Sequence, residues 1–335
     1  MSRITPIATR RWLPALAFGM AFGAHAAPSA DPLAWLQRAA QAARNVSYAG
    51  TYVHTNGERT NTVRITHVRV GGEEHERIEP LDGPPHEIVR RNDEMFCYFP
   101  DAKTVRLDRR INAQFFPSIF RGPPEALSAT YRLSLGKTER VLGYDCQWIR
   151  LDPKDELRYA QRLCAEVGTG LILRAKAMNA RQQVIEQYTF TALRLGNQVG
   201  RADARSIFEA KVKRWTRDAK PLDESRTVET GWTVDRLPPG FRKVTEVRHS
   251  FPGRDKPVSQ LIFTDGIASL SVFVESNPAP GRTRESSNED GTTTFFARPM
   301  GEHLVTVLGE VPLATARQVG QAVARQDAPS VARRP

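Results

Sequence analysis

The stretch CQWIRLDPKDELRYAQRLC, residues 146–164, begins and ends with a cysteine and has the pattern of one β-hairpin. A proline and several charged residues separate its two halves, as is typical of a turn between strands. If Asp152 pairs with Arg158, then Cys146 lies directly opposite Cys164, at a Cα separation of about 4.5 to 5.5 Å that suits a disulfide. A competing register, displaced by two residues, leaves the two thiols diagonal but on the same face. The hairpin therefore predicts a disulfide if the compartment is oxidising.

The N-terminus indicates the compartment. Residues 1–26 begin with basic side chains, continue with an apolar run of about a dozen residues and end in Ala24-His25-Ala26, the order of a cleavable secretory signal. The apolar run is shorter than the roughly 20 residues that a membrane-spanning helix needs. We therefore expect export. The two hairpin cysteines do not form a C-x-x-C motif, so a redox centre is disfavoured, and the expected disulfide would stabilise the fold by about 3 kcal/mol. Cys97 is expected to be a buried thiol outside this disulfide.

Length and charge limit the class of protein. A chain of 335 residues is long enough for two ordinary domains, and a hydrophobic content of 40% supports folded cores. Residues 1–26 hold three arginines and no acidic residue, so the rest of the chain has 45 basic against 37 acidic residues, a net charge of +8. Such a charge suits an anionic partner, for example a lipid phosphate or an acidic peptide, although a solvated basic surface explains it equally well. Export and the scatter of the basic residues argue against nucleic acid.

Residues 27–200 are expected to form one domain that is mostly β. Asp31 followed by Pro32 is typical of a helix start, and apolar residues continue at helical spacing to about Arg44. Runs rich in β-branched and aromatic residues follow, separated by Asn-Gly, Gly-Gly and Asp-Gly turns. We expect strands at 48–54, 62–70, 86–91, 94–99, 104–107, 131–135, 144–151, 157–166, 171–179 and 184–195. About ten strands with hairpin connections predict one large, curved antiparallel sheet.

The rest of the chain is expected to form a second, smaller domain. Residues 201–226 are charged and lack a strand pattern, which predicts a linker. Residues 227–325 contain strand patterns and an Asp265-Gly266 hairpin turn, and apolar residues then recur at helical spacing in 313–323. This combination predicts an α+β domain. The tail, 326–335, is small and basic and is expected to be disordered.

Patterns for catalysis or metal binding are weak. The pentapeptides HEIVR, 86–90, and HERIE, 75–79, begin like the zinc-protease motif, but neither has the second histidine and neither lies in a helical pattern. His67 and the acidic residues near it could ligate a metal only if a hairpin brought them together. No G-x-S-x-G elbow and no glycine-rich phosphate loop occur. We therefore expect no enzyme, no metal and no cofactor, while a catalytic set scattered along the sequence stays an open alternative.

Several stretches together resemble the RseB/MucB family, periplasmic regulators of an envelope-stress sigma factor of the sigma-E or AlgU type. They are LDGPPHEIVRRNDEMFCYFPD (81–101), the strand set at 144–173, WTVDRLPPGF (232–241), FTDGIASLSVFVE (263–275) and VTVLGEVPLATARQVGQAV (305–323). The resemblance runs over about 31–325, and the stretches of the second domain are its most specific part. The three cysteines are a departure from the family pattern, which leaves a redox-sensing role open.

The resemblance implies a fold and a role. The fold is a large N-terminal domain similar to LolA and LolB, a half-open antiparallel β-barrel over a helical plug, joined to a small C-terminal domain. The role is to bind the periplasmic part of a transmembrane anti-sigma factor of the RseA/MucA type and to protect it from regulated proteolysis, with lipopolysaccharide or mislocalised lipoprotein as the releasing signal. The alternatives are a periplasmic lipid or lipoprotein carrier and, third, a hydrolase or thiol–disulfide catalyst. The oligomeric state stays open, and a homodimer is one alternative.

A first group of candidate binding residues lies in NAQFFPSIFRGPPEALSATYRL, residues 112–133. The segment is rich in proline and aromatic residues and has no clear strand period. Such a segment either packs as core or lines a cavity beside the curved sheet, where it would bind a lipid chain. The candidate lipid-binding residues are Phe115, Phe116, Ile119, Phe120 and Tyr131.

A second group is the candidate partner-binding surface of the C-terminal domain. Phe241 follows the stiff turn 237–240, and basic residues accompany it in the next strand. An aromatic residue beside arginines is typical of the residues that dominate interface energies. The alternative is that Phe241 is simply the first core residue of its strand. The candidate residues are Phe241, Arg242, Lys243 and Arg248.

Overall fold

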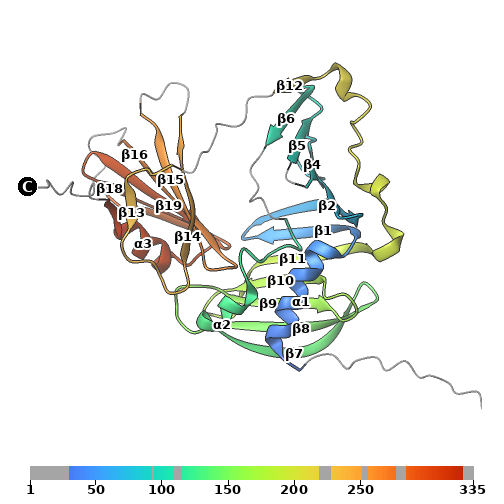
Figure 1. Ribbon diagram of the computed structural model, residues 1–335. Helices are drawn as coiled ribbons and strands as arrows, with labels where there is room; N and C mark the ends of the chain where they lie inside the picture. Colours follow the sequence, from blue (N-terminus) through green and yellow to red (C-terminus); the bar gives the residue numbers. More distant parts are fainter. Residues whose placement is uncertain are drawn as a thin grey trace, which may run out of the picture.

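The computed structural model describes residues 30–92, 94–108, 115–218, 228–250, 256–276 and 284–326. The predicted signal, 1–26, and all of the predicted tail except Gln326 lie outside the described residues. Two domains, each built on its own large sheet, lie side by side (Figure 1). Within the described part of the chain, no helix has the length and apolar character required to cross a membrane.

The N-terminal domain begins with helix α1, Pro32–Asn45. Asp31 caps this helix, because its carboxylate accepts hydrogen bonds from the backbone N–H groups of Leu33 and Ala34, which have no acceptor inside the helix. The predicted helix is therefore confirmed. Its apolar face is buried against the sheet through Trp35, Leu36, Ala39, Ala42 and Ala43.

Twelve strands form the N-terminal sheet, in the order β12-β6-β5-β4-β3-β2-β1-β11-β10-β9-β8-β7. The strands are β1 Tyr48–Asn56, β2 Arg59–Val70, β3 Glu73–Pro80, β4 Glu87–Arg91, β5 Glu94–Phe99, β6 Thr104–Asp108, β7 Tyr131–Val141, β8 Tyr144–Pro153, β9 Ala160–Glu166, β10 Ile172–Met178, β11 Val184–Leu195 and β12 Thr216–Asp218. All neighbours are antiparallel except β12 and β6. In the described part of the chain the edge strands β7 and β12 do not pair with each other, so the sheet is a half-open barrel, and the predicted fold class is confirmed.

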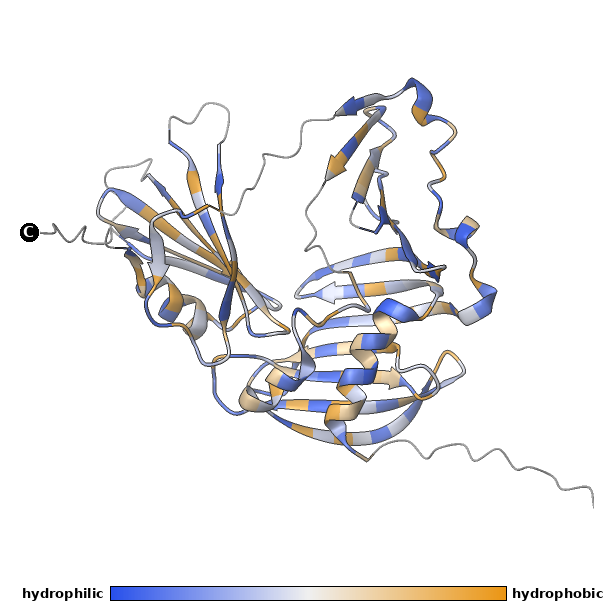
Figure 2. Ribbon diagram, viewed as in Figure 1, coloured by the Kyte–Doolittle hydropathy of each residue, from blue (hydrophilic) through white to orange (hydrophobic). Residues whose placement is uncertain are grey.

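Helix α1 and the segment 115–130 fill the concave side of this sheet (Figures 1 and 2). The segment includes a 3₁₀ turn, η1 Pro124–Ala126, and one helical turn, α2 Leu127–Thr130. It contributes Phe116, Phe120 and Leu127, all of them buried, to the same cluster as the side chains of α1. Burying these large apolar side chains is what holds the open sheet in its curved form.

The hairpin at 146–164 has neither of the two expected registers. Cys146 pairs with Glu166 and Trp148 pairs with Cys164, so the cysteines are diagonal neighbours. The reason is a longer loop: β9 begins only at Ala160, because the loop before it carries Arg158 into contacts with the second domain. A disulfide nevertheless joins Cys146 to Cys164, with a Cα separation of 5.5 Å. Cys97 lies on β5 outside this disulfide and is partly exposed, not buried as expected.

The predicted linker, 201–226, is folded in its described part. Residues 205–218, which we call the strap, lie against the outer face of the sheet and end in β12, which pairs with β6. The predicted boundary at residue 200 is therefore too early. The reason is that Phe208, Val212 and Trp215 of the strap cover apolar side chains of β4–β6, a non-local contact that charge composition does not reveal.

The C-terminal domain is a six-stranded antiparallel sheet covered by one helix, with a separate pair of short strands. The sheet has the order β14-β15-β16-β19-β18-β17, and β13 pairs with β20. The elements are β13 Trp232–Val234, β14 Arg242–His249, β15 Val258–Thr264, β16 Ser269–Ser276, β17 Ser286–Asp290, β18 Thr293–Met300, β19 His303–Gly309, α3 Leu313–Gln321 and β20 Val323–Arg325. The predicted hairpin turn at Asp265-Gly266 and the closing helix are confirmed. Ala316 and Val319 of α3 are buried in the core of this domain.

Candidate functional site

The two domains meet along a contact formed by loops from both sides. The N-terminal domain contributes the segment 115–130, the loop between β8 and β9, and the end of the β1–β2 hairpin. The C-terminal domain contributes the turn 237–240, the β15–β16 turn, the β17–β18 turn and the start of α3. These contacts determine how the two domains are placed relative to each other. The contact between the domains is therefore the best candidate for a functional site.

Arg158 is the centre of the most buried part of this contact. Its side chain is 0% exposed, and Nη1 lies 2.8 Å from Oδ2 of Asp265, whose side chain is also 0% exposed. Nη2 donates to the carbonyl oxygen of Pro239 at 2.7 Å, and Nε and Nη2 donate to the Asp155 carboxylate at 3.0 and 3.1 Å. Asp265 in turn accepts from two backbone N–H groups of its own turn. The Arg158 guanidinium thus donates hydrogen bonds to groups of both domains.

Aromatic rings and charges surround Arg158. The guanidinium carbon lies 5.6 Å from the ring centre of Tyr131 and 5.7 Å from that of Phe241, one ring from each domain. Burial acts to lower the pKa of Arg158, but the hydrogen bond to Asp155 and the charge of Asp265 raise it above its usual value. Burial and the charge of Asp265 raise the pKa of Tyr131. Arg158 therefore stays charged and Tyr131 stays neutral at any physiological pH.

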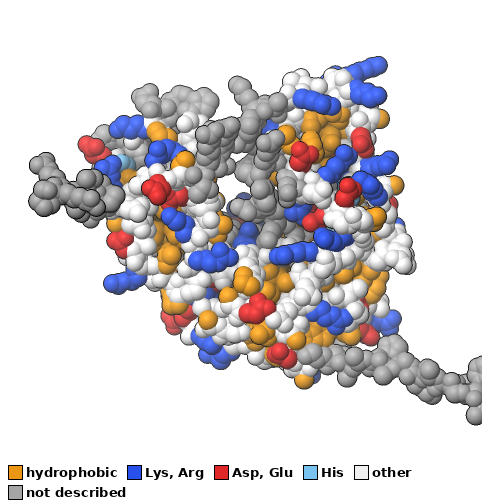
Figure 3. All heavy atoms as spheres, viewed as in Figure 1, with side chains coloured by type: hydrophobic (Ala, Val, Ile, Leu, Met, Phe, Trp, Pro, Cys, Tyr) orange, Lys and Arg blue, Asp and Glu red, His pale blue; other side chains and the backbone are white. Residues whose placement is uncertain are grey.

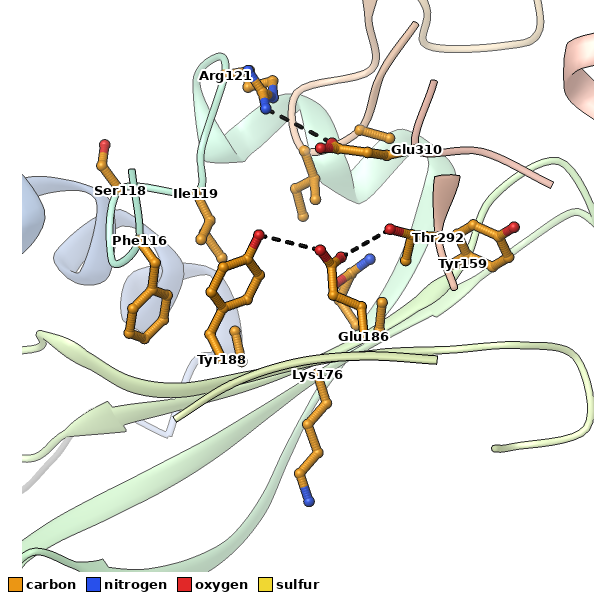
Figure 4. A pocket seen from close by; sticks show the side chains of 15 residues that line it. Phe116, Ser118, Ile119, Arg121, Tyr159, Lys176, Glu186, Tyr188, Thr292 and Glu310 are labelled. Atoms are coloured by element: carbon orange, nitrogen blue, oxygen red, sulfur yellow. Dashed lines mark hydrogen bonds and ion pairs between the residues drawn. The ribbon is translucent and has the colours of Figure 1, made fainter. Parts of the chain in front are cut away.

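A second set of polar contacts centres on Glu186 of β11 (Figure 4). Its Oε1 accepts hydrogen bonds from His54 Nε2 at 2.8 Å and from the Tyr188 hydroxyl at 3.1 Å, and its Oε2 accepts from the Thr292 hydroxyl of the β17–β18 turn at 3.1 Å. The imidazole of His54 stacks on the Tyr188 ring, with the ring centres 4.0 Å apart. Burial and the charge of Glu186 raise the pKa of Tyr188. The Glu186 carboxylate thus joins the N-terminal sheet to the second domain.

Arg121 and Glu310 form a third contact at the same site (Figure 4). Nη2 of Arg121 lies 3.7 Å from Oε2 of Glu310, which follows β19, and the backbone N–H of Arg121 donates to the carbonyl of Gly266 at 2.7 Å. The Glu310 side chain is 42% exposed, and its partial removal from water raises its pKa; the charge of Arg121 opposes this shift and the charge of Glu186 adds to it. Two carboxylates therefore face one cavity, and only one of them is paired with an arginine.

The cavity between these groups is small. Its volume is about 90 Å³, and its lining includes Phe116, Ile119, Tyr188 and Ile267 together with the polar groups described above. Lys176 lies at its edge and points to the opposite side of the sheet (Figure 4). Pockets that hold small molecules are usually about 300 to 1,000 Å³. In this domain arrangement the cavity is therefore too small for a lipid chain.

The predicted lipid-binding residues are divided between this cavity and the core. Phe116 and Ile119 line the cavity, whereas Phe120 and Tyr131 are buried in the core with 3% and 2% exposure. Phe115 packs against the same core from its edge. All five predicted lipid-binding residues thus belong to, or pack against, one hydrophobic core.

The predicted partner-binding residues are also divided. Phe241 is 8% exposed and lies in the core of the C-terminal domain beside Arg158, as the alternative interpretation expected. Arg242, Lys243 and Arg248 are exposed or partly exposed on β14, an edge strand. Arg242 donates to the carbonyl of Arg121, and Lys243 pairs with Glu246 at 2.8 Å. Arg248 donates to the carbonyl oxygens of Glu229 and Thr230, both at 3.2 Å. Of the four predicted residues, only the three basic ones therefore lie at the surface, each with a contact inside the protein.

Sequence analysis missed the residues that join the domains. Arg158 and Asp265 each lie in a turn, where charged residues are common and usually solvated, so no local pattern distinguishes them. Glu186 and Glu310 likewise occur in strand patterns without a motif. Among the described residues, no cluster of three or more His, Cys, Asp or Glu side chains has an arrangement that would hold a metal ion.

Comparison with known proteins assigns the chain to a family. The model of the MucB/RseB N-terminal domain matches residues 31–208, and that of the MucB/RseB C-terminal domain matches residues 226–324. The chain is 31% identical to the sigma factor AlgU regulatory protein MucB of Pseudomonas aeruginosa, over 92% of this chain and 95% of that protein. It is 24% identical to the sigma-E factor regulatory protein RseB of Escherichia coli K12, over 90% of this chain and 92% of that protein.

Solved structures of MucB have the same fold. The structure of the Pseudomonas aeruginosa MucA/MucB complex is 28% identical, with a TM-score of 0.73, and the match covers 89% of this chain and all of that chain. A crystal structure of MucB is 27% identical over 89% of this chain and 98% of that chain, with a TM-score of 0.59. These matches span both domains, and we conclude that the chain belongs to the MucB/RseB family of sigma-factor regulatory proteins.

Proposed function

We propose that this protein acts in the periplasm, where it binds the periplasmic part of a transmembrane anti-sigma factor and protects it from regulated proteolysis. In this way it restrains an envelope-stress sigma factor. The observation that carries the proposal is the similarity of both domains to MucB in its complex with MucA, at a TM-score of 0.73. The carrier alternative has less support, because the cavity on the inner side of the sheet is only about 90 Å³.

The basic edge of the C-terminal sheet is the proposed partner surface. β14 is an edge strand, so part of its backbone can pair with an added chain. Arg242, Lys243 and Arg248 project from it, and they suit an acidic peptide. Phe241 supports this surface from inside the domain without reaching the partner.

The domain arrangement is proposed to control this surface. Two complexes of MucB with MucA match this structure with TM-scores of 0.73 and 0.71, whereas a crystal structure of MucB matches at 0.59 with nearly the same identity and coverage. The difference in score suggests that the present arrangement is the one that binds the partner. The Arg121 backbone forms hydrogen bonds with both Gly266 and Arg242. A change at the domain contact would therefore alter the position of the Arg242 side chain on β14.

A binding measurement tests this proposal. The reagents are the chain without residues 1–26 and a fluorescent peptide of the cognate anti-sigma factor's periplasmic segment. Arg242→Glu with Arg248→Glu should weaken binding about thirtyfold or more, equivalent to about 2 kcal/mol, because hot-spot arginines contribute that much. The matched control is Lys137→Glu with Arg181→Glu, two exposed basic residues of the N-terminal domain.

The outcomes are distinct. Unchanged affinity in the β14 variant would move the partner surface to the N-terminal sheet, and absence of any binding by the unaltered protein would contradict the proposed function. Protection of the peptide against a periplasmic protease should follow the same ranking of variants. Sedimentation of the same samples would show whether the binding species is a homodimer.

A further inference from the structure

The outer face of β4–β6 is apolar and is covered by the strap. Ladder pairing places Val89 opposite Phe96 and Phe96 opposite Leu107, so these side chains share one face of the sheet. Ile88, which points the other way, packs against the inner core. The strap supplies Phe208, Val212 and Trp215 to the outer face, and the rings of Phe208 and Trp215 lie 5.5 Å apart. The outer face thus has an apolar cluster separate from the inner core.

The strap is held at both of its ends. At one end, Ser206 donates a hydrogen bond to the carboxylate of Glu87, which also accepts from the backbone N–H of Ile207. At the other end, β12 pairs with β6. The space between the strap and the sheet is therefore formed in the folded protein and needs no rearrangement to exist.

A pocket of about 510 Å³ lies between the strap and the sheet. Its floor consists of Phe96, Tyr98, Val105 and Leu107 from the sheet and Val212 from the strap. In the upper right of Figure 3, hydrophobic side chains gather among Lys and Arg side chains over β4–β6 and the strap. The volume is within the range of about 300 to 1,000 Å³ of small-molecule pockets and more than five times that of the inner cavity.

The rim of this pocket is basic. Arg91 from the sheet and Glu209 from the strap form an ion pair at 3.2 Å across it. Lys213 and Arg217 also lie on the rim and are exposed, and within the described part of the chain neither forms an ion pair. Among the described residues, the rim therefore has two positive charges without a carboxylate partner, above a floor whose only side-chain polar group is the Tyr98 hydroxyl.

We propose that this pocket binds the single hydrocarbon chain of a long-chain fatty acid. The chain lies on the apolar floor, and the carboxylate lies at the rim between Lys213 and Arg217. A peptide fits less well, because its backbone N–H and C=O groups would lose their hydrogen bonds to water on an apolar floor. A neutral lipid would leave the two positive charges unused.

Only the biological role of this pocket rests on the proposed function: in a regulator of this kind, the pocket would let the protein respond to free fatty acids. The binding reaction itself does not depend on the anti-sigma factor. Failure of fatty-acid binding would leave the peptide-binding result untouched, and the reverse is also true.

The test is a titration of the delipidated protein with the fluorescent fatty acid cis-parinaric acid. We expect saturable binding of one molecule per chain. Lys213→Glu with Arg217→Glu should raise the Kd at least tenfold, because the carboxylate then meets two negative charges. The control, Lys137→Glu with Arg181→Glu, should leave the Kd unchanged. The methyl ester of the probe, which has no charge, should not distinguish the rim variant from the unaltered protein.

A second measurement does not depend on the rim variant folding. A dibrominated stearic acid should quench the fluorescence of Trp215, which lies in the cluster beside the pocket. The quenching should be lost in Trp215→Phe and retained in Trp148→Phe. Non-saturable binding, a rim variant with unchanged Kd, or quenching that survives in Trp215→Phe would each overturn the proposal.

Discussion

The two ends of the domain contact use the same kind of ion pair in different surroundings. At one end, Arg158 and Asp265 are both 0% exposed, and their atoms lie 2.8 Å apart. At the other end, Arg59 of β2 lies 2.7 Å from Asp290 of β17, but the two side chains are 73% and 29% exposed. The distances are nearly equal, so distance alone does not distinguish the two pairs.

The difference in burial determines what each pair contributes. Removing one member of a buried pair leaves a charge without water or partner, at a cost of about 3 to 5 kcal/mol, whereas exposed pairs contribute about 0 to 1 kcal/mol. The Arg158 end therefore determines how the domains are placed. The Arg59 ion pair can break at little cost, so relative motion of the domains should be centred on Arg158.

The largest expected effect is that of Asp265→Ala. The substitution removes the carboxylate that pairs with Arg158 and that accepts from the N–H groups of Ile267 and Ala268. We expect the free energy of unfolding to fall by about 3 to 5 kcal/mol, measured by urea denaturation. A loss below about 1 kcal/mol would show that the buried pair is no stronger than an exposed one.

A double substitution separates charge from packing at this end. In Arg158→Met with Asp265→Leu neither charge is left unpaired, so the protein should be more stable than Asp265→Ala. If the double variant is the less stable of the two, then the other hydrogen bonds of Arg158, to Asp155 and Pro239, contribute more than the pair itself.

Much of the fold could be predicted from sequence, because it depends on local patterns. The cap at Asp31, the strand periods and the Asp-Gly turn all use chemistry within a few residues. The hairpin at 146–164 shows where this fails. Its strands were predicted and its disulfide is present, yet the register differs, because the loop before Ala160 is shaped by Asp265 more than 100 residues away.

The candidate site was harder to predict for the same reason. Phe241 has the sequence context of an interface residue, but Arg158 and the C-terminal core bury it. The strap has the composition of a linker, and only its three apolar side chains meet a complementary face. In both cases the deciding contact is between distant parts of the chain.

An intermediate effect is expected from pH at Glu310, which lies between the two ends. Its pKa is raised in the folded protein, first of all by partial removal from water, since 42% of its side chain stays exposed, and ionisation is therefore harder in the folded state. The penalty is absent below the unfolded pKa of about 4.3, develops as pH rises from there to the raised folded pKa, and is complete above it. Glu310→Gln should therefore raise the Tm at pH 7.5 and leave it unchanged at pH 4. If Glu310→Gln is less stable than the unaltered protein at pH 7.5, then the attraction between Glu310 and Arg121 contributes more than the cost of removing the carboxylate from water.

The smallest effect is expected at the exposed end, for Arg59→Ala. Two turns meet there, at Gly57 and Gly291, both with positive φ, and a Cβ on either would collide with the other turn. The Asn56 side chain accepts from the backbone N–H of Thr292 at 2.8 Å, so the turns stay in register without the ion pair. We expect Arg59→Ala to lower the free energy of unfolding by about 0 to 1 kcal/mol, with a smaller loss at high salt.

Combining the variants tests whether the ends are independent. For distant sites, the effects of Arg59→Ala and Asp265→Ala should add within about 0.5 kcal/mol. If Arg59→Ala instead costs nothing once Asp265 is replaced, then the contact at Gly57 and Gly291 forms only while the Arg158 end is closed. That result would make the buried pair the switch for the whole domain contact, whereas simple addition would mean that each end closes on its own.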